Sequence, residues 1–406
     1  MYRLLSAFAI VLTFAGAVPQ IALGQSATME FSVTAPPENL KADPYYEKYV
    51  SVDGYPILAA GSVNDYALKE AAFLINQMLV ERPDVRRAMI NGGSRLLIIP
   101  WNEFTTDIPE YSQMKPKDYW DARARGLGGS RTDPYCSCGE ENLLCYPGDP
   151  YSTENILIHE FAHNIHLRGM VVVDPTFDER LEDTYNDAMK NGLWEGAYAS
   201  TNHHEYFAEG VQSWFNNNRE NDHDHNHVNT RKELLEYDPG LAKICEEVFG
   251  ETALEYTKPH TRLTGHLAGY RPELAPTFTW PDRLLATKQE IREKAMKRAE
   301  LAQEQRENVL EWQNAASSGI PNSITRSQQS TTLLFENQSK EPVKLWWQDD
   351  QGKTHEYREL RPKSEFRQQT YSGHVWVVKS LDGDVLGYFI ASEKPATAVI
   401  PSKSAD

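Results

Sequence analysis

The 406-residue sequence has few cysteines, no excess of basic residues and no internal repeat. After residue 24 it also lacks any apolar run long enough to span a bilayer, so we expect no membrane anchor in the mature protein. Lys and Arg number 41 against 58 Asp and Glu, which gives a formal net charge of −17. Such an acidic chain disfavours nucleic acid and anionic membrane surfaces as partners.

The first 24 residues, MYRLLSAFAIVLTFAGAVPQIALG, contain one basic residue, then an apolar run, then small residues. This pattern is typical of a secretory signal peptide. A membrane anchor is the alternative, but the run is short and no basic flank follows it. We therefore predict a secreted, extracellular protein with a signal peptide at residues 1–24.

The four cysteines are Cys136, Cys138, Cys145 and Cys245. An even number in an exported protein predicts two disulfide bonds. A bridge between Cys136 and Cys138 is sterically poor, so we expect one of them to pair with Cys145 and the other with Cys245. A cysteine-ligated metal site is the alternative, which an oxidising compartment disfavours.

Residues 25–43 predict an extended segment, and residues 44–281 mix strand and helix patterns. YVSVDGYPILAAG predicts a hairpin, VNDYALKEAAFLINQMLVERPDV an amphipathic helix, and SRLLIIP a buried strand. Residues 125–151 carry several glycines and three cysteines and predict a long functional loop. These patterns together indicate an α+β domain.

Dense charge and strong helix formers over residues 282–314 predict a long solvated helix. With the flexible linker that follows, this part extends over residues 282–330. Seven short strand-like runs separated by turn residues then occupy residues 331–401. They predict a small all-β sandwich.

Ser152 or Thr153 before ILIHEFAHNIH, and Gly169 after it, predict the limits of a further helix. His159 and His163 in this helix fit the pattern H-E-x-x-H. Residues four apart project side by side from one helical face, so the two imidazoles can bind one metal ion. A helix that happens to carry histidines is the alternative.

Glu160 lies next to the first histidine, where a carboxylate can take a proton from a metal-bound water. The third ligand of the extended pattern H-E-x-x-H-x-x-G-x-x-H is missing, because His166 and Gly169 stand where Gly and His are required. Glu205 and Glu209, four residues apart in HHEYFAEG, provide a ligand and a supporting carboxylate instead.

HEFAH, the tyrosine at 198 and EYFAE together resemble the gluzincin metallopeptidases of the anthrax lethal-factor-like group. This resemblance implies a zincin-like fold for residues 44–281 and one catalytic Zn²⁺ per chain. It implies Glu205 as the third ligand, Tyr198 as a hydrogen-bond donor to the oxyanion, and Glu209 as support for a ligand histidine. Glu160 is then the general base of a zinc metalloendopeptidase that cleaves peptide or protein substrates.

For the histidines outside the H-E-x-x-H pattern, the sequence predicts less specific roles. His203 and His204 either line the cleft or are polar residues of a helix N-terminus. His166 is expected to pack or form hydrogen bonds rather than bind the zinc. NDHDHNH at residues 221–227 offers a second metal site, although exposed loops of this composition more often bind metal adventitiously.

FENQS, LWWQDDQG, EYRELRP and YSGHVWVV resemble the β-domain of the von Hippel–Lindau tumour suppressor. In that family an aromatic pocket holds a hydroxyproline of the target peptide. The pocket positions fall here on Trp346, Tyr357, Thr370, His374 and Trp376. Gln369 departs from the family, which has a histidine there.

Strand alternation places Val375 and Val377 on one face and Trp376 on the other, so we expect one face to meet solvent or a ligand. We therefore predict a secreted zinc metallopeptidase with a C-terminal peptide- or matrix-binding module, and hydroxyproline-containing proteins as a substrate class. One alternative is a secreted binding protein with an inactive scaffold, which the intact Glu160 disfavours. Another is a zinc hydrolase of non-peptide bonds.

Overall fold

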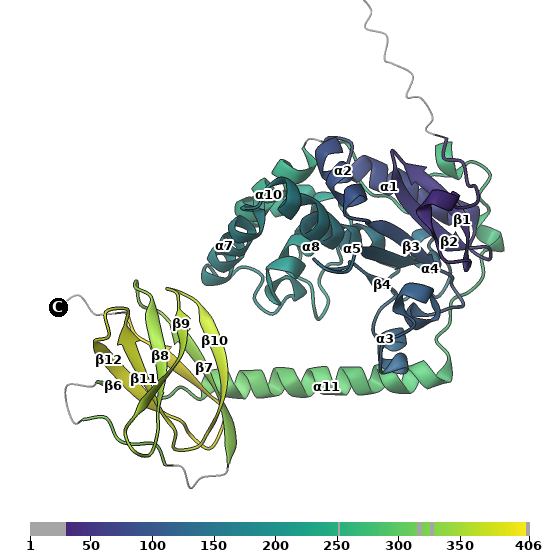
Figure 1. Cartoon of the computed structure of the whole chain (residues 1–406). Coiled ribbons are helices and arrows are strands. Elements are labelled where there is room, and N and C mark those ends of the chain that lie inside the picture. Colours follow the sequence, from purple (N-terminus) through teal and green to yellow (C-terminus); the bar gives the residue numbers. More distant parts are fainter. Residues whose placement is uncertain (1–29, 251, 315–318, 325–328, 403–406) are drawn as a thin grey trace, which may run out of the picture.

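The computed structural model describes residues 30–402 except residues 251, 315–318 and 325–328. An α+β domain, one long helix and a β-sandwich follow one another along the chain (Figure 1). Here "α+β domain" means the elements from β1 to α10, and "sandwich" means those from β6 to β13. The predicted signal peptide at residues 1–24 lies outside the described residues. Among the residues that are described, no helix has both the length and the apolar character needed to cross a bilayer.

The sheet of the α+β domain has five strands. In spatial order they are β1 (Tyr46–Val52), β2 (Tyr55–Ala60), β3 (Arg95–Ile99), β5 (Tyr135–Gly139) and β4 (Gly126–Leu127). The first two strands form the predicted antiparallel hairpin, and Asp53 and Gly54 have the positive φ angles that its turn requires. The middle strands β2, β3 and β5 run parallel, and β4 is antiparallel to β5.

The loop predicted at residues 125–151 is wrong, because this region contains β4, β5 and the short helix α4 (Glu140–Leu143). Four of the five residues of β5 are buried between neighbouring strands and helices. A buried cysteine packs like a small apolar side chain. The sequence YCSCG therefore fills a central strand without the β-branched residues by which strands are recognised.

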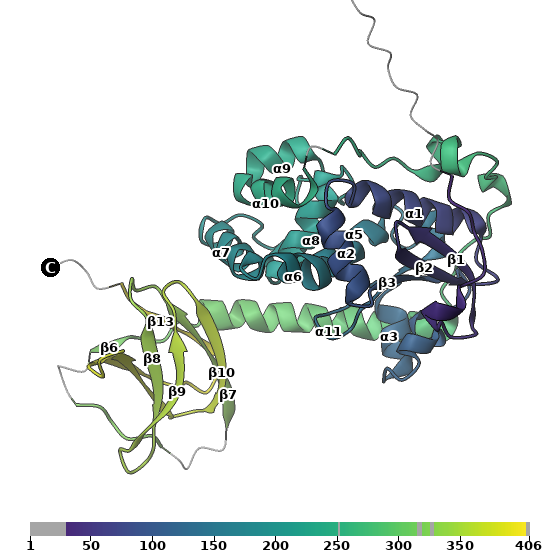
Figure 2. The same cartoon turned by 45° about the horizontal axis from the view of Figure 1, so that its top comes forward.

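Within the described residues, the α+β domain has ten α-helices. They are α1 (Asp65–Met78), α2 (Pro83–Asn91), α3 (Lys117–Arg123), α4, α5 (Ile156–Asn164), α6 (Val171–Val173), α7 (Phe177–Lys190), α8 (His203–Trp214), α9 (Arg231–Tyr237) and α10 (Pro239–Phe249). Helix α5 packs on β5, and α8 packs on the other side of α5 (Figure 2). The helix that carries H-E-x-x-H is thus held between the sheet and α8.

The limits of α5 differ from the predicted ones. Asn155 caps the helix through its side chain, which accepts a hydrogen bond from Ile158 N, so the prediction of Ser152 or Thr153 was wrong. The chain also does not leave the helix before Gly169. It continues as a π-helix over Ile165–Met170 and then as α6.

The predicted disulfide bonds are wrong, because all four cysteines are free thiols. Cys136 and Cys138 lie two residues apart on β5 and fill the main hydrophobic core, as does Cys245 on α10. Cys145 is half-buried beside the hydroxyl of Tyr256. Burial raises the pKa of each thiol, which keeps it protonated and unreactive.

The predicted long helix is α11 (Asp282–Glu307), which runs from α3 to the sandwich (Figure 1). At its start, Leu284 is fully buried, and Arg283 forms ion pairs with Asp118 and Asp121 of α3. In its last turn, the buried side chain of Gln305 donates hydrogen bonds to backbone oxygens of two sandwich strands.

The sandwich consists of a three-stranded and a five-stranded sheet that share one apolar core. Its strands are β6 (Gln313–Asn314), β7 (Ser330–Asn337), β8 (Val343–Gln348), β9 (Thr354–Leu360), β10 (Glu365–Tyr371), β11 (Val375–Ser380), β12 (Val385–Ile390) and β13 (Ala396–Ile400). The last seven match the seven predicted strands. Residues 319–324, expected in a flexible linker, pack against β8 and β11 instead.

Candidate metal centre

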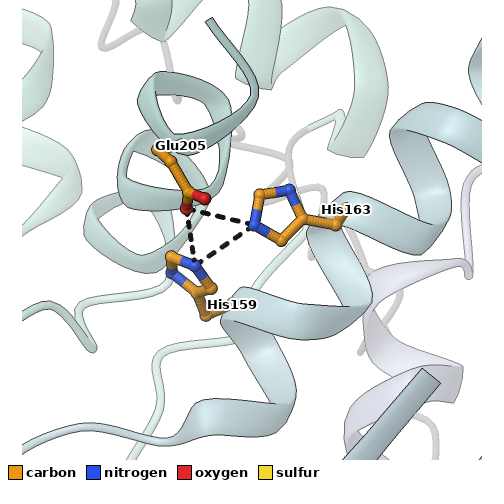
Figure 3. Close-up of side chains that lie close together, drawn as sticks. All are labelled: His159, His163 and Glu205. Carbon is orange, nitrogen blue, oxygen red and sulfur yellow. Dashed lines mark hydrogen bonds and ion pairs between the residues drawn. The ribbon is translucent and has the colours of Figure 1, made fainter. Parts of the chain in front are cut away.

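His159 and His163 project from the same face of α5, as their spacing predicts. Their Nε2 atoms lie 3.2 Å apart, and both side chains are largely buried. Glu205, in the first turn of α8, directs its carboxylate between them (Figure 3). Its Oε2 atom is 3.2 Å from the Nε2 atom of each histidine.

The three atoms therefore form a nearly equilateral triangle. Ligand atoms bonded to a tetrahedral zinc at about 2.0–2.1 Å lie about 3.3 Å apart, so the observed spacing fits one zinc ion. Two imidazoles and one carboxylate are also a known ligand set for catalytic zinc, which leaves a fourth position open. The residues present fit the metal in both spacing and chemistry.

The electrostatics of the centre favour a positive charge between these side chains. Burial lowers the pKa of His159, but hydrogen bonding to Glu205 and the nearby acidic side chains outweigh it and raise the pKa to about 10. Burial would raise the pKa of Glu205, yet the two histidines hold it well below the ordinary carboxyl range. A cation at this position is therefore stabilised from several sides.

Glu160 is half-buried beside the triangle, on the side of α5 that β4 covers. A Cβ atom at Gly126 would approach its Cγ atom to 3.0 Å, so β4 lies directly on this side chain. Burial raises the pKa of Glu160 above that of an ordinary carboxyl, against the opposing effect of the two histidines. A carboxylate with a raised pKa accepts a proton more readily, which is what a general base requires.

Tyr198 lies near His159, in the short 3-10 helix over Tyr198–Ser200. Its ring centroid is 6.3 Å from that of His159, and about a third of the side chain is exposed. Burial, together with the carboxylates of Glu205 and Glu160, raises the pKa of its phenol well above the ordinary value. The hydroxyl thus stays protonated and can donate a hydrogen bond.

Glu209 is buried one turn after Glu205, with its Oε1 atom 3.5 Å from His159 Nδ1. A closer partner of this nitrogen is Gln212, whose Oε1 atom lies 2.8 Å away. The amide of Gln212 in turn donates to the buried carboxylate of Glu154. Neither Gln212 nor Glu154 fits a recognisable spacing, so neither could be identified from the sequence.

The loop NDHDHNH contributes to the same support. His225 Nε2 lies 3.3 Å from Glu209 Oε2, and its Nδ1 atom contacts Asp222 and Arg219. The backbone oxygen of Asp224 accepts a hydrogen bond from Tyr198 N. Within the described residues this loop does not bring three metal-binding side chains together. It holds Glu209 and Tyr198 instead.

In the sandwich, four of the five residues assigned to an aromatic pocket lie in one cluster. The Tyr357 ring packs edge-on against Trp376, and Trp376 Nε1 donates to Thr370 Oγ1 over 3.0 Å. Thr370 Oγ1 also lies 3.2 Å from His374 Nδ1. Trp376 and Thr370 are buried, while half of Tyr357 is exposed.

The fifth residue, Trp346, points to the opposite face of the strand and was wrongly assigned. It pairs with Val377, and Lys379 Nζ lies 4.3 Å from its ring. The next residue, Trp347, pairs with Trp376 and packs against His374, so it belongs to the cluster. Identifying Trp347 would have required the strand register, which the sequence did not give.

The expectation that one face of β11 meets solvent or a ligand was also wrong. Trp376 fills the core between the sheets, while Val375 and Val377 are buried members of a second apolar cluster, against which Ile320 and Trp346 pack. Residues 319–324 therefore cover the outer face of this strand.

Comparison with known families gives a match in the C-terminal part of the chain. The family model of the VHL beta domain matches residues 323–386. The sandwich is thus VHL-like, and the match begins at the buried residue Ser323, whose hydroxyl contacts β8 and β11. Among curated proteins, no significant match to the chain was found.

Proposed function

We propose that this protein is a secreted zinc metalloendopeptidase of the gluzincin type, similar to the lethal-factor-like group. The sandwich would serve as its peptide- or matrix-binding module. The observation that carries the proposal is the 3.2 Å triangle of His159, His163 and Glu205, with Glu160 and Tyr198 close to its histidines.

Zinc bound at the triangle would act as a Lewis acid and lower the pKa of a coordinated water. Glu160 would accept a proton during attack on the peptide carbonyl and pass it to the leaving amine, a role that its raised pKa supports. Tyr198 would donate a hydrogen bond to the oxygen on which negative charge develops. Gln212 and Glu209 would fix the orientation of His159.

A peptide substrate is supported by the position of β4. Among the described residues, β4 is an edge strand of the sheet. It lies against the side of α5 that carries Glu160. The edge of a sheet can pair with an extended peptide through backbone hydrogen bonds. A peptide bound along β4 would therefore pass close to the metal centre.

The sandwich cluster supports a hydroxyproline-containing target. Tyr357 and Trp347 provide aromatic rings suited to a proline ring, with the buried Trp376 packed behind Tyr357, and His374 and Thr370 provide polar groups that could meet its hydroxyl. Gln369 is exposed at the edge of this region, where its amide contacts Ser330. Recognition of the hydroxyl would thus depend on His374 and Thr370.

The test combines metal content with cleavage of a mixed peptide library, measured on the purified chain and two variants. We expect Glu205→Ala to lose one equivalent of zinc and all cleavage. We expect Glu160→Gln to keep the zinc but to lose cleavage by at least about 10²-fold, because only the proton acceptor is removed.

The zinc and cleavage measurements also distinguish the peptidase from the alternative functions. Zinc loss in Glu205→Ala without any library cleavage by the wild-type chain would favour an inactive scaffold or hydrolysis of a non-peptide bond. A wild-type chain that binds no zinc at His159, His163 and Glu205 after reconstitution would refute the proposal.

A further inference from the structure

A second group of metal-binding side chains lies outside the site described above. It consists of His166 on the π-helix η4 (Ile165–Met170), Asp178 on α7 and His204 on α8. One ligand atom from each residue lies within 4.8 Å of the others. His166 follows His163 along the same helical run, but a π-turn holds more residues than an α-turn, so the face of His159 and His163 is not continued there.

Three imidazoles converge on one carboxylate oxygen in this cluster. Asp178 Oδ1 lies 2.8 Å from His166 Nε2, 3.3 Å from His203 Nε2 and 3.9 Å from His204 Nε2. A carboxylate oxygen has about two lone-pair positions, so it cannot accept good hydrogen bonds from all three rings. His166 and His203 lie within hydrogen-bond distance of this oxygen, whereas the Nε2 atom of His204 lies beyond it.

The side chains of this cluster differ in how deeply they are buried. His166 is fully buried, and its Nδ1 atom has no hydrogen-bond partner among the described residues, so its one polar contact lies inside the cluster. The side chains of Asp178 and His204 are 30% and 39% exposed, which gives an ion access from solvent.

We propose that His166, Asp178 and His204 bind a second zinc ion, with His203 beside them. Two imidazoles and a carboxylate suit zinc better than the hard cations calcium and magnesium, which prefer oxygen ligands alone. The ion would replace the single hydrogen bond of His166 and would meet the otherwise unused nitrogen of His204. Water could complete its coordination on the exposed side.

This second ion would join the elements that carry the first centre. His204 directly precedes Glu205 on α8, and His166 lies three residues after His163. Asp178 anchors α7 to both of them. Zinc at this position would therefore hold the start of α8 against the end of the α5 segment. Its role would be structural, since Glu160 and Tyr198 belong to the first centre.

The test measures zinc per chain in the full-length protein after equilibration with Zn²⁺ alone. We expect two equivalents in the wild-type chain and one in Glu205→Ala. We also expect one equivalent in Asp178→Ala and in His204→Ala, and none when Asp178→Ala is combined with Glu205→Ala. In the Glu205→Ala background, added zinc should raise the melting temperature, and Asp178→Ala should abolish that rise.

Two variants serve as controls. Arg131→Ala removes the ion pair of Asp178 Oδ2 but leaves all three ligands, so it should keep both equivalents. His223→Ala removes an exposed histidine of the NDHDHNH loop and should also keep both. If His223→Ala instead removes the second equivalent, the ion binds the loop and the proposal is wrong.

The remaining outcomes distinguish this inference from the proposed function. One equivalent that disappears in Glu205→Ala would overturn the second site and leave the first intact. One equivalent that persists in Glu205→Ala but disappears in Asp178→Ala would support the second site and refute the first. Two equivalents that survive both Asp178→Ala and His204→Ala would also overturn the second site.

Discussion

The orientation of His159 depends on a side chain that lies far away in the sequence. With Nε2 directed at the metal position, Nδ1 carries the proton and donates to Gln212, 53 residues further along the chain. Such a partner fixes the tautomer and the ring angle of a ligand histidine. Gln212 is itself held by the buried carboxylate of Glu154.

We expect Gln212→Ala to weaken zinc binding at the first centre by about 10- to 100-fold, because the imidazole of His159 loses its fixed orientation. Competition with a chromophoric chelator would measure the dissociation constant. Gln289→Ala, at an exposed position on α11, is the matched control and should leave the affinity unchanged. Equal affinities in wild type and Gln212→Ala would show that Glu209 alone orients the ring.

At the residue scale, the sequence predicted which side chains would meet where helix geometry decides it. His159 and His163 come together because they are four residues apart on one helix. Gln212 and His225 reach the site through tertiary packing, which no spacing encodes. Trp347 was missed in favour of Trp346 because a one-residue change of register exchanges the two faces of a strand.

At the scale of secondary-structure elements, the contact between β4 and α5 lies next to the candidate metal centre. Gly128, directly after β4, has no room for a side chain, since a Cβ atom there would collide with His163 and come within 2.9 Å of the Glu160 backbone oxygen. The strand can therefore lie on the helix only with glycine at this position.

We expect Gly128→Ala to push the strand away from α5, to destabilise the protein by about 1–3 kcal/mol and to reduce zinc affinity. Gly61→Ala is the control, since its Cβ would meet only the flexible carboxylate of Glu47, and its stability should change by less than about 0.5 kcal/mol. Thermal denaturation and metal titration of both variants would measure this. Unchanged zinc binding in Gly128→Ala would mean that β4 does not shape the centre.

Most elements followed from the sequence wherever hydrophobic periodicity was strong. The β1–β2 hairpin, α1 and the seven strands of the sandwich were predicted from alternation, helical spacing and turn residues, and α11 was predicted from its dense charge and strong helix formers. β5 was missed because cysteine and glycine stand in place of branched side chains. The π-helix was missed because its hydrogen-bond pattern leaves no mark on composition.

For the molecule as a whole, the redox state of the cysteines decides whether they stabilise the protein through disulfide bonds or through packing. Three of the four thiols lie inside the main hydrophobic core, so they contribute through packing and not through covalent links. The prediction of two disulfides came from the even number of cysteines and the N-terminal signal pattern, and neither of these gives the distances between side chains.

We expect mass spectrometry of the unfolded, unreduced chain to show four cysteines that react with iodoacetamide. In the native protein, Cys145 should react first, because it is only half-buried, and the three core cysteines should react much more slowly. A mass lower by four hydrogens and no alkylation would indicate two disulfides and contradict the structure. Cleavage activity that survives a reducing agent would agree with free thiols.

Helix α11 rises about 39 Å over its 26 residues, yet it does not carry the sandwich away from the α+β domain. Figure 1 shows the end of α7 beside the sandwich, and Tyr185 on α7 feels the charges of Glu365 on β10 and Arg306 at the end of α11. Tyr185 also donates a hydrogen bond to the backbone oxygen of Ser200, two residues after Tyr198. The helix therefore acts as a strut that returns the sandwich to the side of the domain where α7 and Tyr198 lie. Removing whole turns from α11 would pull the sandwich out of this position.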